Sequence, residues 1–527
     1  MIRKKITEQY SVSEQLTPED VDVLARDGVT HIICNRPDDE EAGQRPFTEI
    51  AAIAKEKGMQ AIHIPFVAGG MQPTHVAAFK EAMRDAKCVH AYCRSGNRSH
   101  KIWQAAQQTD NHASVGQHTH QYDVVIVGAG SAGISTAASI SKRNSSLRIC
   151  LIDPSVDHFY QPGWTLVGCG VFESSKTRRN MADVIPKGAK WLNESVKTFI
   201  PTENKVLLEN GQIIDYHFLV IAAGIQLNWN AIEGLSETLG QNGVTSNYRY
   251  DLAPYTWKLV HELKGGKAVF TQPPMPIKCA GAPQKAMYLS CDYWLKHNKL
   301  HNFQVSFCNA GGVLFGVSEY VPALESYVRK YNAKLHFGQT LVRVDGPNHR
   351  AYFATKNEQG EPSEVEVEFD MLHVCPPQSA PDFIRESPLV DESGWVDVDR
   401  DTLQHKSFDN VWSLGDVCNA PNAKTLAAVR KQAPVVAQNI VDAWAGKSLR
   451  ATYDGYGSCP LTVERGKIVL AEFTYGGKVA PTFPKWVNDG TKATSFAWIL
   501  KKDILPPFYW QGMLKGYEWF VKPKMRS

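Results

Sequence analysis

The stretch YDVVIVGAGSAGISTAASISK, residues 122–142, decides the fold of most of this chain. An apolar run leads into Gly128, Gly130 and Gly133, and a run of small residues typical of a helix follows. In such a turn the first glycine allows a tight bend, the second lets the backbone approach a pyrophosphate, and the third lets helix and strand pack closely. The stretch therefore predicts a strand, a nucleotide-binding turn and a helix.

The next predicted strand supplies an acidic residue at the spacing that this fold requires. RICLID ends in Asp153, which follows Gly133 by about 20 residues, and a carboxylate at that distance can accept a hydrogen bond from a ribose hydroxyl. A glycine turn alone is weak evidence. Strand, glycines, helix and acid together predict a dinucleotide-binding domain.

Two later stretches indicate that the dinucleotide is FAD. FLVIAAG predicts a strand that ends at Ala223 and Gly224, as in flavoproteins with two dinucleotide-binding domains. VWSLGD predicts another strand, which ends in Gly415 and Asp416. In such proteins this late Gly-Asp pair meets the ribityl chain of the flavin, and the N-terminus of the next helix faces the isoalloxazine ring.

The central part of the chain, residues 236–384, is expected to form a second domain of the same kind without its glycine fingerprint. After the predicted strand KAVFTQ comes PIKCAGAPQ, which holds Cys279 and a single glycine, Gly281. After the next strand, FQVSFCNA, come glycines but no acidic residue in the ribose position. NADH binding is therefore disfavoured, and a thiolate at the turn offers another route for electrons into the flavin.

A second thiol follows the late flavin motif. GDVCNAPNAKT places Cys418 beside the expected flavin ring, and the helix that follows would lower the pKa of a nearby thiol. We therefore expect Cys279 and Cys418 to meet on one face of the flavin. Lys424 in the same loop either stabilises an anionic flavin or is a solvated loop lysine. Cys169 is a weaker candidate, and Cys459 stays undecided. The cysteines in predicted strands or helices are expected to be structural, namely Cys34, Cys88, Cys150, Cys291, Cys308 and Cys375.

Residues 1–107 are expected to form a separate small α/β domain with a reactive thiol. AYCRSGNRSH places Cys93 at the end of a predicted strand, in a loop that closes on Arg98. Backbone N–H groups and the arginine of such a loop form an anion cradle that lowers the pKa of the thiol. Tyrosine-phosphatase-like loops have five residues between Cys and Arg. Here four intervene, as in the tighter loops of rhodanese-type sulfurtransferases.

The stretch upstream of this loop, LTPEDVDVLARDGVTHIICNRPDDEE, resembles bacterial phosphatase-like domains with a proposed role in sulfur transfer. Sulfur transfer is favoured, while a phosphatase, an anion-binding module and an inactive loop stay open as alternatives. Residues 108–121 lack periodicity and predict a linker, and the histidines in it show no metal-ligand pattern.

Composition and charge exclude several classes of protein. A chain of 527 residues predicts two to four domains, and a net charge of +3 implies no broad nucleic-acid surface. Eleven cysteines without a CxxC pair argue against a zinc site and against a secreted disulfide framework. We expect no signal peptide, and no apolar run approaches the roughly 18 residues of a membrane span.

The last part of the chain, residues 447–527, is rich in aromatic residues and lysine, as in FAWILKKDILPPFYWQGMLKGYEWFVKPKMRS. Aromatic rings suit the membrane interface and lysines suit anionic head groups. Composition alone slightly favours an ordinary aromatic helix pair that caps the core over peripheral membrane attachment.

Several stretches resemble the type II sulfide:quinone oxidoreductases, which include mitochondrial enzymes. These are HFYQPGWTLVG, IKCAGAPQKAMYLS, MLHVCPP, GWVDVD with TLQH, YDGYGSCPL and LPPFYWQGMLKGY. The resemblance extends over about residues 122–527. It implies an α/β fold with two Rossmann-like domains, as in flavin disulfide reductases, and a C-terminal amphipathic region that associates with the membrane. In this arrangement residues 122–235 and 385–446 form the FAD-binding domain.

The resemblance also implies a reaction. Sulfide would be oxidised on a cysteine pair, Cys279 and Cys418, with two electrons passing through FAD to a membrane quinone. A small thiol or sulfite would take up the sulfur. In the mitochondrial relatives the second cysteine is expected directly after the Gly-Asp pair, where this chain has Val417.

We expect the protein to lie on the cytoplasmic side of a bacterial inner membrane. Whether copies of the chain form an oligomer stays open. The main alternative is an NAD(P)H-dependent persulfide or disulfide reductase.

Overall fold

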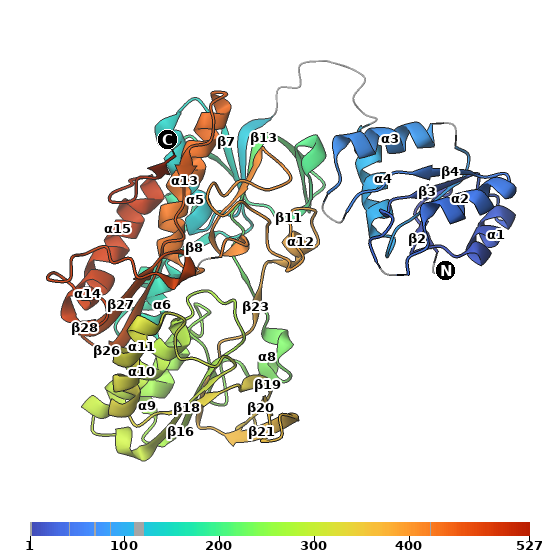
Figure 1. The fold of residues 1–527 in the computed structure, drawn as a ribbon. Helices are drawn as coiled ribbons and strands as arrows, with labels where there is room; N and C mark the ends of the chain where they lie inside the picture. Colours follow the sequence, from blue (N-terminus) through green and yellow to red (C-terminus); the bar gives the residue numbers. More distant parts are fainter. Residues whose placement is uncertain are drawn as a thin grey trace. The chain divides into compact units, whose positions relative to one another are not determined.

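The computed structural model describes residues 3–41, 43–67, 70–84, 86–109, 121–421 and 423–526. The chain forms two compact units, Met1–Thr119 and His120–Ser527 (Figure 1). The division falls in the expected linker, most of which lies outside the described residues.

The first unit is built on one sheet in the strand order β1-β2-β5-β3-β4, where all neighbours are parallel except β1 and β2. Helices α3 and α4 share a hydrophobic cluster with one face of the sheet, and α1 and α2 with the other. The expected α/β domain is therefore present. Its elements are β1 (Lys4–Lys5), β2 (Tyr10–Ser13), α1 (Pro18–Arg26), β3 (His31–Cys34), α2 (Phe47–Glu56), β4 (Gln60–His63), α3 (Pro73–Met83), β5 (Val89–Tyr92) and α4 (Asn97–Thr109).

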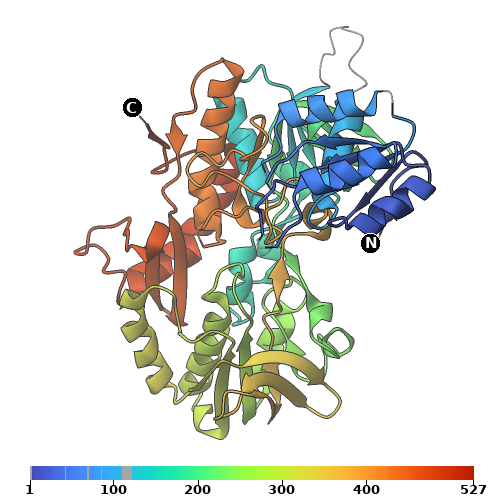
Figure 2. The same ribbon diagram turned by 45° about the vertical axis from the view of Figure 1, so that its right-hand side comes forward.

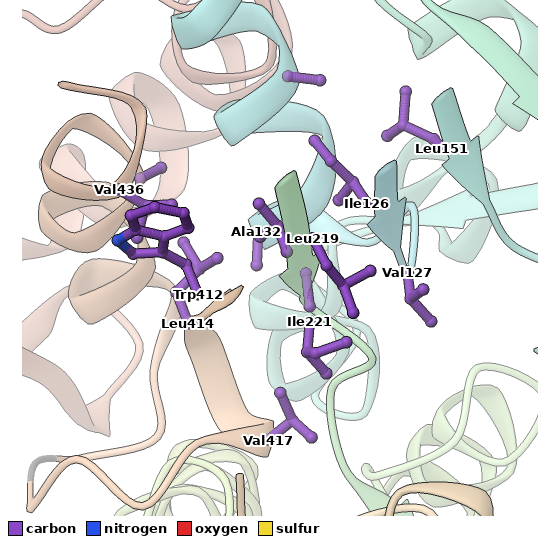
Figure 3. Close-up of a cluster of buried hydrophobic side chains, with 14 of the residues drawn as sticks. Ile126, Val127, Ala132, Leu151, Leu219, Ile221, Trp412, Leu414, Val417 and Val436 are labelled. Carbon is purple, nitrogen blue, oxygen red and sulfur yellow. The ribbon is translucent and has the colours of Figure 1, made fainter. Parts of the chain in front are cut away.

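The second unit begins with a sheet in the strand order β10-β7-β6-β13-β12-β11. Strand β24 pairs in parallel with the C-terminal end of β13. Its strands are β6 (Tyr122–Val127), β7 (Ile149–Ile152), β10 (Lys190–Leu192), β11 (Val196–Ile200), β12 (Lys205–Leu208), β13 (Ile213–Ile221) and β24 (Val411–Ser413). The central strands are parallel and apolar, because helices cover them. Figure 3 shows Ile126, Leu219 and Trp412 of this core.

Helices α5 (Ser131–Arg143) and α13 (Leu426–Trp444) lie side by side against this sheet in both views (Figures 1 and 2). Thr425 begins α13, because its hydroxyl accepts the N–H of Ala428. The two helices thus bring the glycine turn before α5 and the Gly-Asp loop before α13 to the same end of the sheet.

The second sheet of this unit is parallel, in the order β15-β22-β16-β17-β18. Its elements are β15 (Val244–Thr245), α9 (Ala253–Glu262), β16 (Gly266–Gln272), α10 (Ala282–Lys296), β17 (Phe303–Asn309), α11 (Val321–Lys330), β18 (Lys334–Phe337) and β22 (Met371–His373). A small antiparallel sheet follows β18, formed by β19 (Thr340–Asp345), β20 (Arg350–Lys356) and β21 (Pro362–Glu368). Helix α10 begins directly after the turn that holds Cys279 and Gly281.

The C-terminal region is partly core and partly exposed. It consists of β25 (Ala451–Thr452), β26 (Gly457–Glu464), β27 (Lys467–Phe473), β28 (Ala493–Thr494), α14 (Ser495–Ile499), a π-helical turn (Leu500–Ile504), α15 (Leu505–Gln511) and β29 (Lys524–Met525). Strand β26 is buried and packs on α10. Within the described parts of the chain, no helix has the length and apolar character needed to cross a membrane.

Short elements complete the second unit. They are β8 (Asp157–Phe159), α6 (Trp164–Val167), β9 (Arg178–Asn180), α7 (Met181–Val184), β14 (Gln226–Leu227), α8 (Leu235–Thr238), β23 (Gln378–Ser379) and α12 (Asp382–Arg385).

Candidate active site

Two thiols from distant parts of the chain meet at the start of α10. The Sγ atom of Cys279 lies 3.5 Å from the Sγ atom of Cys459, which is on β26. A disulfide requires about 2.05 Å between the sulfur atoms, so the structure holds a reduced pair within reach of a bond. The buried Cys459, which the sequence left undecided, is therefore the thiol that faces Cys279.

The expected pairing of Cys279 with Cys418 is corrected by this geometry. Cys418 is fully buried, and its thiol donates to the carbonyl oxygen of Gly415 at 3.4 Å, inside its own turn. Burial raises the pKa of the Cys418 thiol. Cys418 lies in the late loop, as the sequence shows, but its side chain bonds within that loop, and the thiol that faces Cys279 is Cys459.

The single glycine of the thiol turn has a steric role. A Cβ atom at Gly281 would lie 2.6 Å from Cys459 Sγ and 2.3 Å from a methyl carbon of Leu461. Its φ of −88° is one that any residue adopts, so space and not backbone strain requires glycine. Gly281, the single glycine in the place of the missing nucleotide fingerprint, therefore leaves the space that the Cys459 side chain occupies.

Cys279 itself occupies a backbone conformation that non-glycine residues rarely adopt, with φ at 51°. Its N–H donates to the carbonyl oxygen of Lys424 at 2.9 Å, and its own carbonyl accepts the N–H of Ala282 at 2.7 Å. These bonds join the thiol turn to the loop that follows Gly415 and Asp416.

A buried lysine sets the charge of the thiol pair. Lys285 Nζ lies 3.0 Å from Cys279 Sγ and 3.9 Å from Cys459 Sγ. The hydrogen bond from Cys459 lowers the pKa of Cys279 well below its ordinary value, and the Lys285 ammonium adds to this against the effect of burial. The pKa of Cys459 is raised by its bond to Cys279 and by burial. Of the two thiols, Cys279 is thus the one that ionises more readily.

A second buried lysine, Lys501, lies within electrostatic range of both thiols. Its Nζ donates to Thr462 Oγ1 at 3.2 Å, and burial with the nearby Lys285 charge lowers its pKa to about 7. Sequence reasoning missed Lys285 and Lys501. Lys285 was within reach of inference, because it lies six residues, under two helical turns, after Cys279.

The glycine turn of β6 and α5 fits a dinucleotide. A Cβ atom at Gly128 would lie 2.4 Å from Ala222 O, and one at Gly133 would lie 1.9 Å from Gly128 O. At Gly130 a Cβ atom would meet nothing within 4 Å. Gly128 and Gly133 thus permit close backbone packing. Gly130 leaves open space before α5, a helix whose first N–H groups have no side-chain cap.

Asp153 lies beside this turn. Its carboxylate accepts the N–H of Ala129 at 2.7 Å and that of Ser155 at 2.8 Å. The carboxylate therefore fixes the glycine turn, and its bond to a ribose hydroxyl stays a prediction. Ala223 and Gly224 follow β13 after one intervening residue, Ala222. Gly224 has a φ of 73°, and a Cβ atom there would meet nothing within 4 Å.

The late loop lies next to the same turn. A Cβ atom at Gly415 would lie 3.2 Å from the side chain of Ala132, and Asp416 is buried enough to have its carboxyl pKa raised. Lys424 Nζ donates to the carbonyl oxygens of Asp416 (2.6 Å) and Cys418 (3.0 Å). Only 8% of Lys424 is exposed, so the reading as a solvated loop lysine is wrong.

The other cysteines have no such arrangement. Cys169 is buried, donates to Leu166 O at 3.3 Å, and has its pKa raised to about 11, chiefly by burial. The cysteines expected to be structural are buried, except for the half-buried Cys88. They are Cys34, Cys88, Cys150, Cys291, Cys308 and Cys375.

The first unit holds a separate thiol site at the carboxyl end of β5. Cys93 is fully buried, and burial raises its thiol pKa, but the N–H groups of Ser99, Ser95 and Arg98 lower it below its ordinary value. Gly96 allows the tight loop at a φ of 82°. The expected cradle of backbone N–H groups around Cys93 is present.

Arg98 closes this loop but is already occupied by a carboxylate. Its Nη1 and Nη2 atoms donate to the two oxygens of Glu40 at 2.8 and 2.7 Å, and Nη1 also donates to Phe66 O at 2.8 Å. Arg36 donates to the same carboxylate. The guanidinium that closes the loop around the Cys93 thiol is thus paired with a carboxylate of the same unit.

Comparisons with known proteins agree with this division of the chain. Residues 3–110 match the family model of the phosphatase-like domain of beta-lactamase hydrolase-like protein, and residues 122–260 match that of pyridine nucleotide-disulphide oxidoreductase. The chain is 42% identical over 402 residues to the mitochondrial sulfide:quinone oxidoreductase of Dictyostelium discoideum, covering 76% of this chain and 87% of the relative.

The corresponding mouse protein is 39% identical over 398 residues, with 76% of this chain and 87% of the relative covered. The solved structure of the sulfide:quinone oxidoreductase from Aquifex aeolicus covers 77% of this chain and 97% of that chain with a TM-score of 0.63. Its identity of 19% makes this a likeness of fold.

Proposed function

The chain belongs to the sulfide:quinone oxidoreductase family, and from this premise we propose how its own residues carry out the reaction. It is an oxidoreductase that oxidises sulfide with a quinone as the electron acceptor. The single observation that carries the mechanism is the Cys279–Cys459 pair beside Lys285. We propose that this pair, as a disulfide, is where sulfide reacts.

In the first step HS⁻ attacks Cys459 Sγ of the disulfide. A new S–S bond forms, the Cys279–Cys459 bond breaks, and Cys279 leaves as a thiolate with the bonding electron pair. Cys459 then carries the persulfide. This direction follows from the pKa order, because the better leaving group is the thiol with the lower pKa, Cys279. Lys285 Nζ, 3.0 Å away, stabilises the thiolate that is released.

In the second step a small thiol or sulfite attacks the outer sulfur of the persulfide and carries it away, which leaves Cys459 reduced. Loss of two electrons from the two thiols then restores the disulfide. When bound, FAD supplies the two-electron acceptor for this oxidation, and a quinone reoxidises it. The protons released by the thiols are taken up with the electrons by the quinone.

We propose that FAD is held by the glycine turn at Gly128, Gly130 and Gly133, with the Gly415–Asp416 loop beside it. The hydrogen bond from Cys279 N to Lys424 O supports this, because it keeps the thiol turn next to that loop. Asp153, Ala223 and Gly224 border the same space, and Lys424 fixes the loop backbone.

The C-terminal region supports quinone access from a membrane surface. Nine of the twenty large hydrophobic side chains that are exposed among the described residues lie between residues 479 and 525. Trp486 and Phe520 are 86% and 89% exposed, and such aromatic rings favour the interface of a bilayer. We propose peripheral attachment through this region. Replacing Phe520 by Ser should weaken sedimentation with lipid vesicles, whereas Trp444→Ala, on α13, should not.

The test of the mechanism is an anaerobic titration with sulfide in the presence of sulfite as the sulfur acceptor, followed by the flavin absorbance, and then with a soluble quinone. Cys279→Ser and Cys459→Ser should abolish sulfide-dependent bleaching, and Cys418→Ser is the matched control that should bleach like wild type. Loss of bleaching in Cys418→Ser alone would overturn the proposed pair. Rapid bleaching by NADH would favour the NAD(P)H-dependent alternative.

We further propose that the first unit transfers sulfane sulfur through Cys93. Its thiolate would attack the outer sulfur of a persulfide R–S–SH, release RS⁻, and pass the sulfur to a second thiol or to sulfite. The lowered pKa of Cys93 supports this, since the thiolate is the nucleophile. Cys93→Ser should abolish sulfur transfer, and Cys88→Ser should not. Cys93-dependent hydrolysis of a phosphate ester without sulfur transfer would favour a phosphatase.

A further inference from the structure

The C-terminal region contacts the glycine turn through one buried side chain, Tyr509 of α15. Its hydroxyl lies 2.7 Å from Ser131 Oγ, in the first residue of α5, and 2.5 Å from His158 Nε2. The other ring nitrogen of His158 lies 3.2 Å from the carbonyl oxygen of Ala129, inside the turn. Two of the turn's residues are thus tied to a helix nearly 400 residues later in the chain.

The direction of each hydrogen bond follows from chemistry. Ala129 O is an acceptor only, so His158 Nδ1 carries the proton, and the Nε2 of a neutral ring must accept. Burial lowers the pKa of His158 to about 4, which keeps the ring neutral at pH 7. Tyr509 therefore donates to His158 Nε2, and its oxygen accepts the Ser131 hydroxyl proton. The hydrogen bonds from Ser131 through Tyr509 and His158 to Ala129 O thus each have a single direction.

The same segment is fastened along the length of α5. Arg143 and Glu518 form an ion pair at 2.5 Å, and Lys142 Nζ lies 3.1 Å from the centre of the Tyr517 ring. A Cβ atom at Gly516 would lie 2.7 Å from Ala138 O. Residues 505–518 therefore dock closely on the helix whose N-terminus faces the dinucleotide space.

We propose that Tyr509 is a positioning residue for the dinucleotide cofactor, and that docking of residues 505–518 and binding of the cofactor are thermodynamically coupled. The inference rests on the proposed function, in which FAD occupies the glycine turn. Tyr509 holds Ser131 directly and Ala129 through His158, so it fixes the N–H groups that meet a pyrophosphate. Because coupling is reciprocal, bound cofactor must also hold the C-terminal segment in place.

The experiment compares wild type, Tyr509→Phe and Tyr517→Phe. Tyr517 lies in the same segment, 46% exposed, and its ring stacks on Trp519, so its hydroxyl is a matched control. We expect Tyr509→Phe to bind FAD about fivefold to tenfold more weakly, as the loss of one buried hydrogen-bond network member predicts. FAD should also raise the melting temperature of Tyr509→Phe by less than it raises that of wild type. A purely structural role would lower the apo and FAD-bound melting temperatures equally.

A second measurement needs only the wild-type protein. FAD should slow tryptic cleavage after the exposed Lys515, because bound cofactor stabilises the docked segment. An unchanged cleavage rate, or a Tyr509→Phe variant with wild-type FAD affinity and melting shift, would overturn the inference while leaving the proposed function intact. A wild-type chain that takes up no FAD would overturn both.

Discussion

At the scale of single residues, the chemistry depends on which of two facing thiols carries the negative charge. Lys285 Nζ lies closer to Cys279 Sγ than to Cys459 Sγ, and the hydrogen bond between the two sulfurs lowers the pKa of Cys279 and raises that of Cys459. In the proposed mechanism this asymmetry makes Cys279 the leaving group and Cys459 the residue that carries the persulfide.

Replacing Lys285 with Met should therefore raise the pKa of Cys279. Alkylation of Cys279 in the reduced protein should slow several-fold near pH 7 and recover at higher pH, where the thiol ionises without help. The rate is measured by mass spectrometry of the Cys279 peptide. Lys285→Arg, which keeps the charge, should restore most of the wild-type profile. An unchanged pH profile in Lys285→Met would contradict the assignment.

Replacing Gly281 with Ala should separate the two sulfurs. The added methyl group would collide with Cys459 Sγ and Leu461, so sulfide turnover should fall at least tenfold. Gly316→Ala is the control, because a Cβ atom there meets nothing within 4 Å. Equal turnover in the two variants would show that the backbone adjusts at no functional cost.

At the scale of elements, local pattern predicted a great deal. The apolar spacing of APQKAMYLSCDYWLK, after the thiol turn, is that of a helix, and it forms α10, Ala282–Lys296. The helix expected after the Gly-Asp loop is α13. Both have strong local signals in their apolar spacing and in the turns before them. The partner of Cys279 had no such signal, because β26 and α10 are 180 residues apart at the two thiols, and a tertiary contact of that kind leaves no local periodicity.

The glycine turn allows a prediction that separates binding from folding. Gly130→Ala should fold with a melting temperature near that of the wild-type apoprotein, since its added methyl group meets open space, yet bind FAD weakly. Gly133→Ala should unfold at clearly lower temperature, because the methyl group would lie on Gly128 O. Thermal melts with and without FAD distinguish the two. Normal FAD binding by Gly130→Ala would place the pyrophosphate elsewhere.

At the scale of the whole molecule, the two units have separate cores, and each holds a thiol whose pKa is lowered, Cys93 in the first and Cys279 in the second. The family resemblance of residues 122–527 could be read from sequence, because long matched stretches fix the cofactor domain and the thiol turn. Cys459 itself lies inside one of those stretches, YDGYGSCPL. Only the packing of β26 on α10 shows that its thiol faces Cys279.

Buried histidines predict acid sensitivity. Burial lowers the pKa of His373 to about 4, while an unfolded histidine titrates near 6.5. Below pH 6.5 the unfolded chain therefore binds more protons than the folded chain. The contribution of His373 to the free energy of unfolding is complete above that pH and is lost as the pH falls toward 4. His373 contributes up to about 1.4 kcal/mol per pH unit in this window.

Urea denaturation at pH 7.5 and pH 5.0 measures this contribution. The difference between the two pH values should be smaller in His373→Gln than in wild type, by about 2 kcal/mol. Identical pH dependence in both proteins would exclude His373 as a source of acid sensitivity.

The position of the thiol pair in the chain has a mechanical consequence. A bond between Cys279 and Cys459 closes a loop that spans 180 residues, and such a cross-link removes unfolded-state freedom worth about 5 kcal/mol. In the proposed mechanism each turnover therefore breaks and re-forms a covalent cross-link between the turn before α10 and β26. The resting oxidised enzyme should be the heat-resistant form, and sulfide, in reacting, transiently loosens the protein that consumes it.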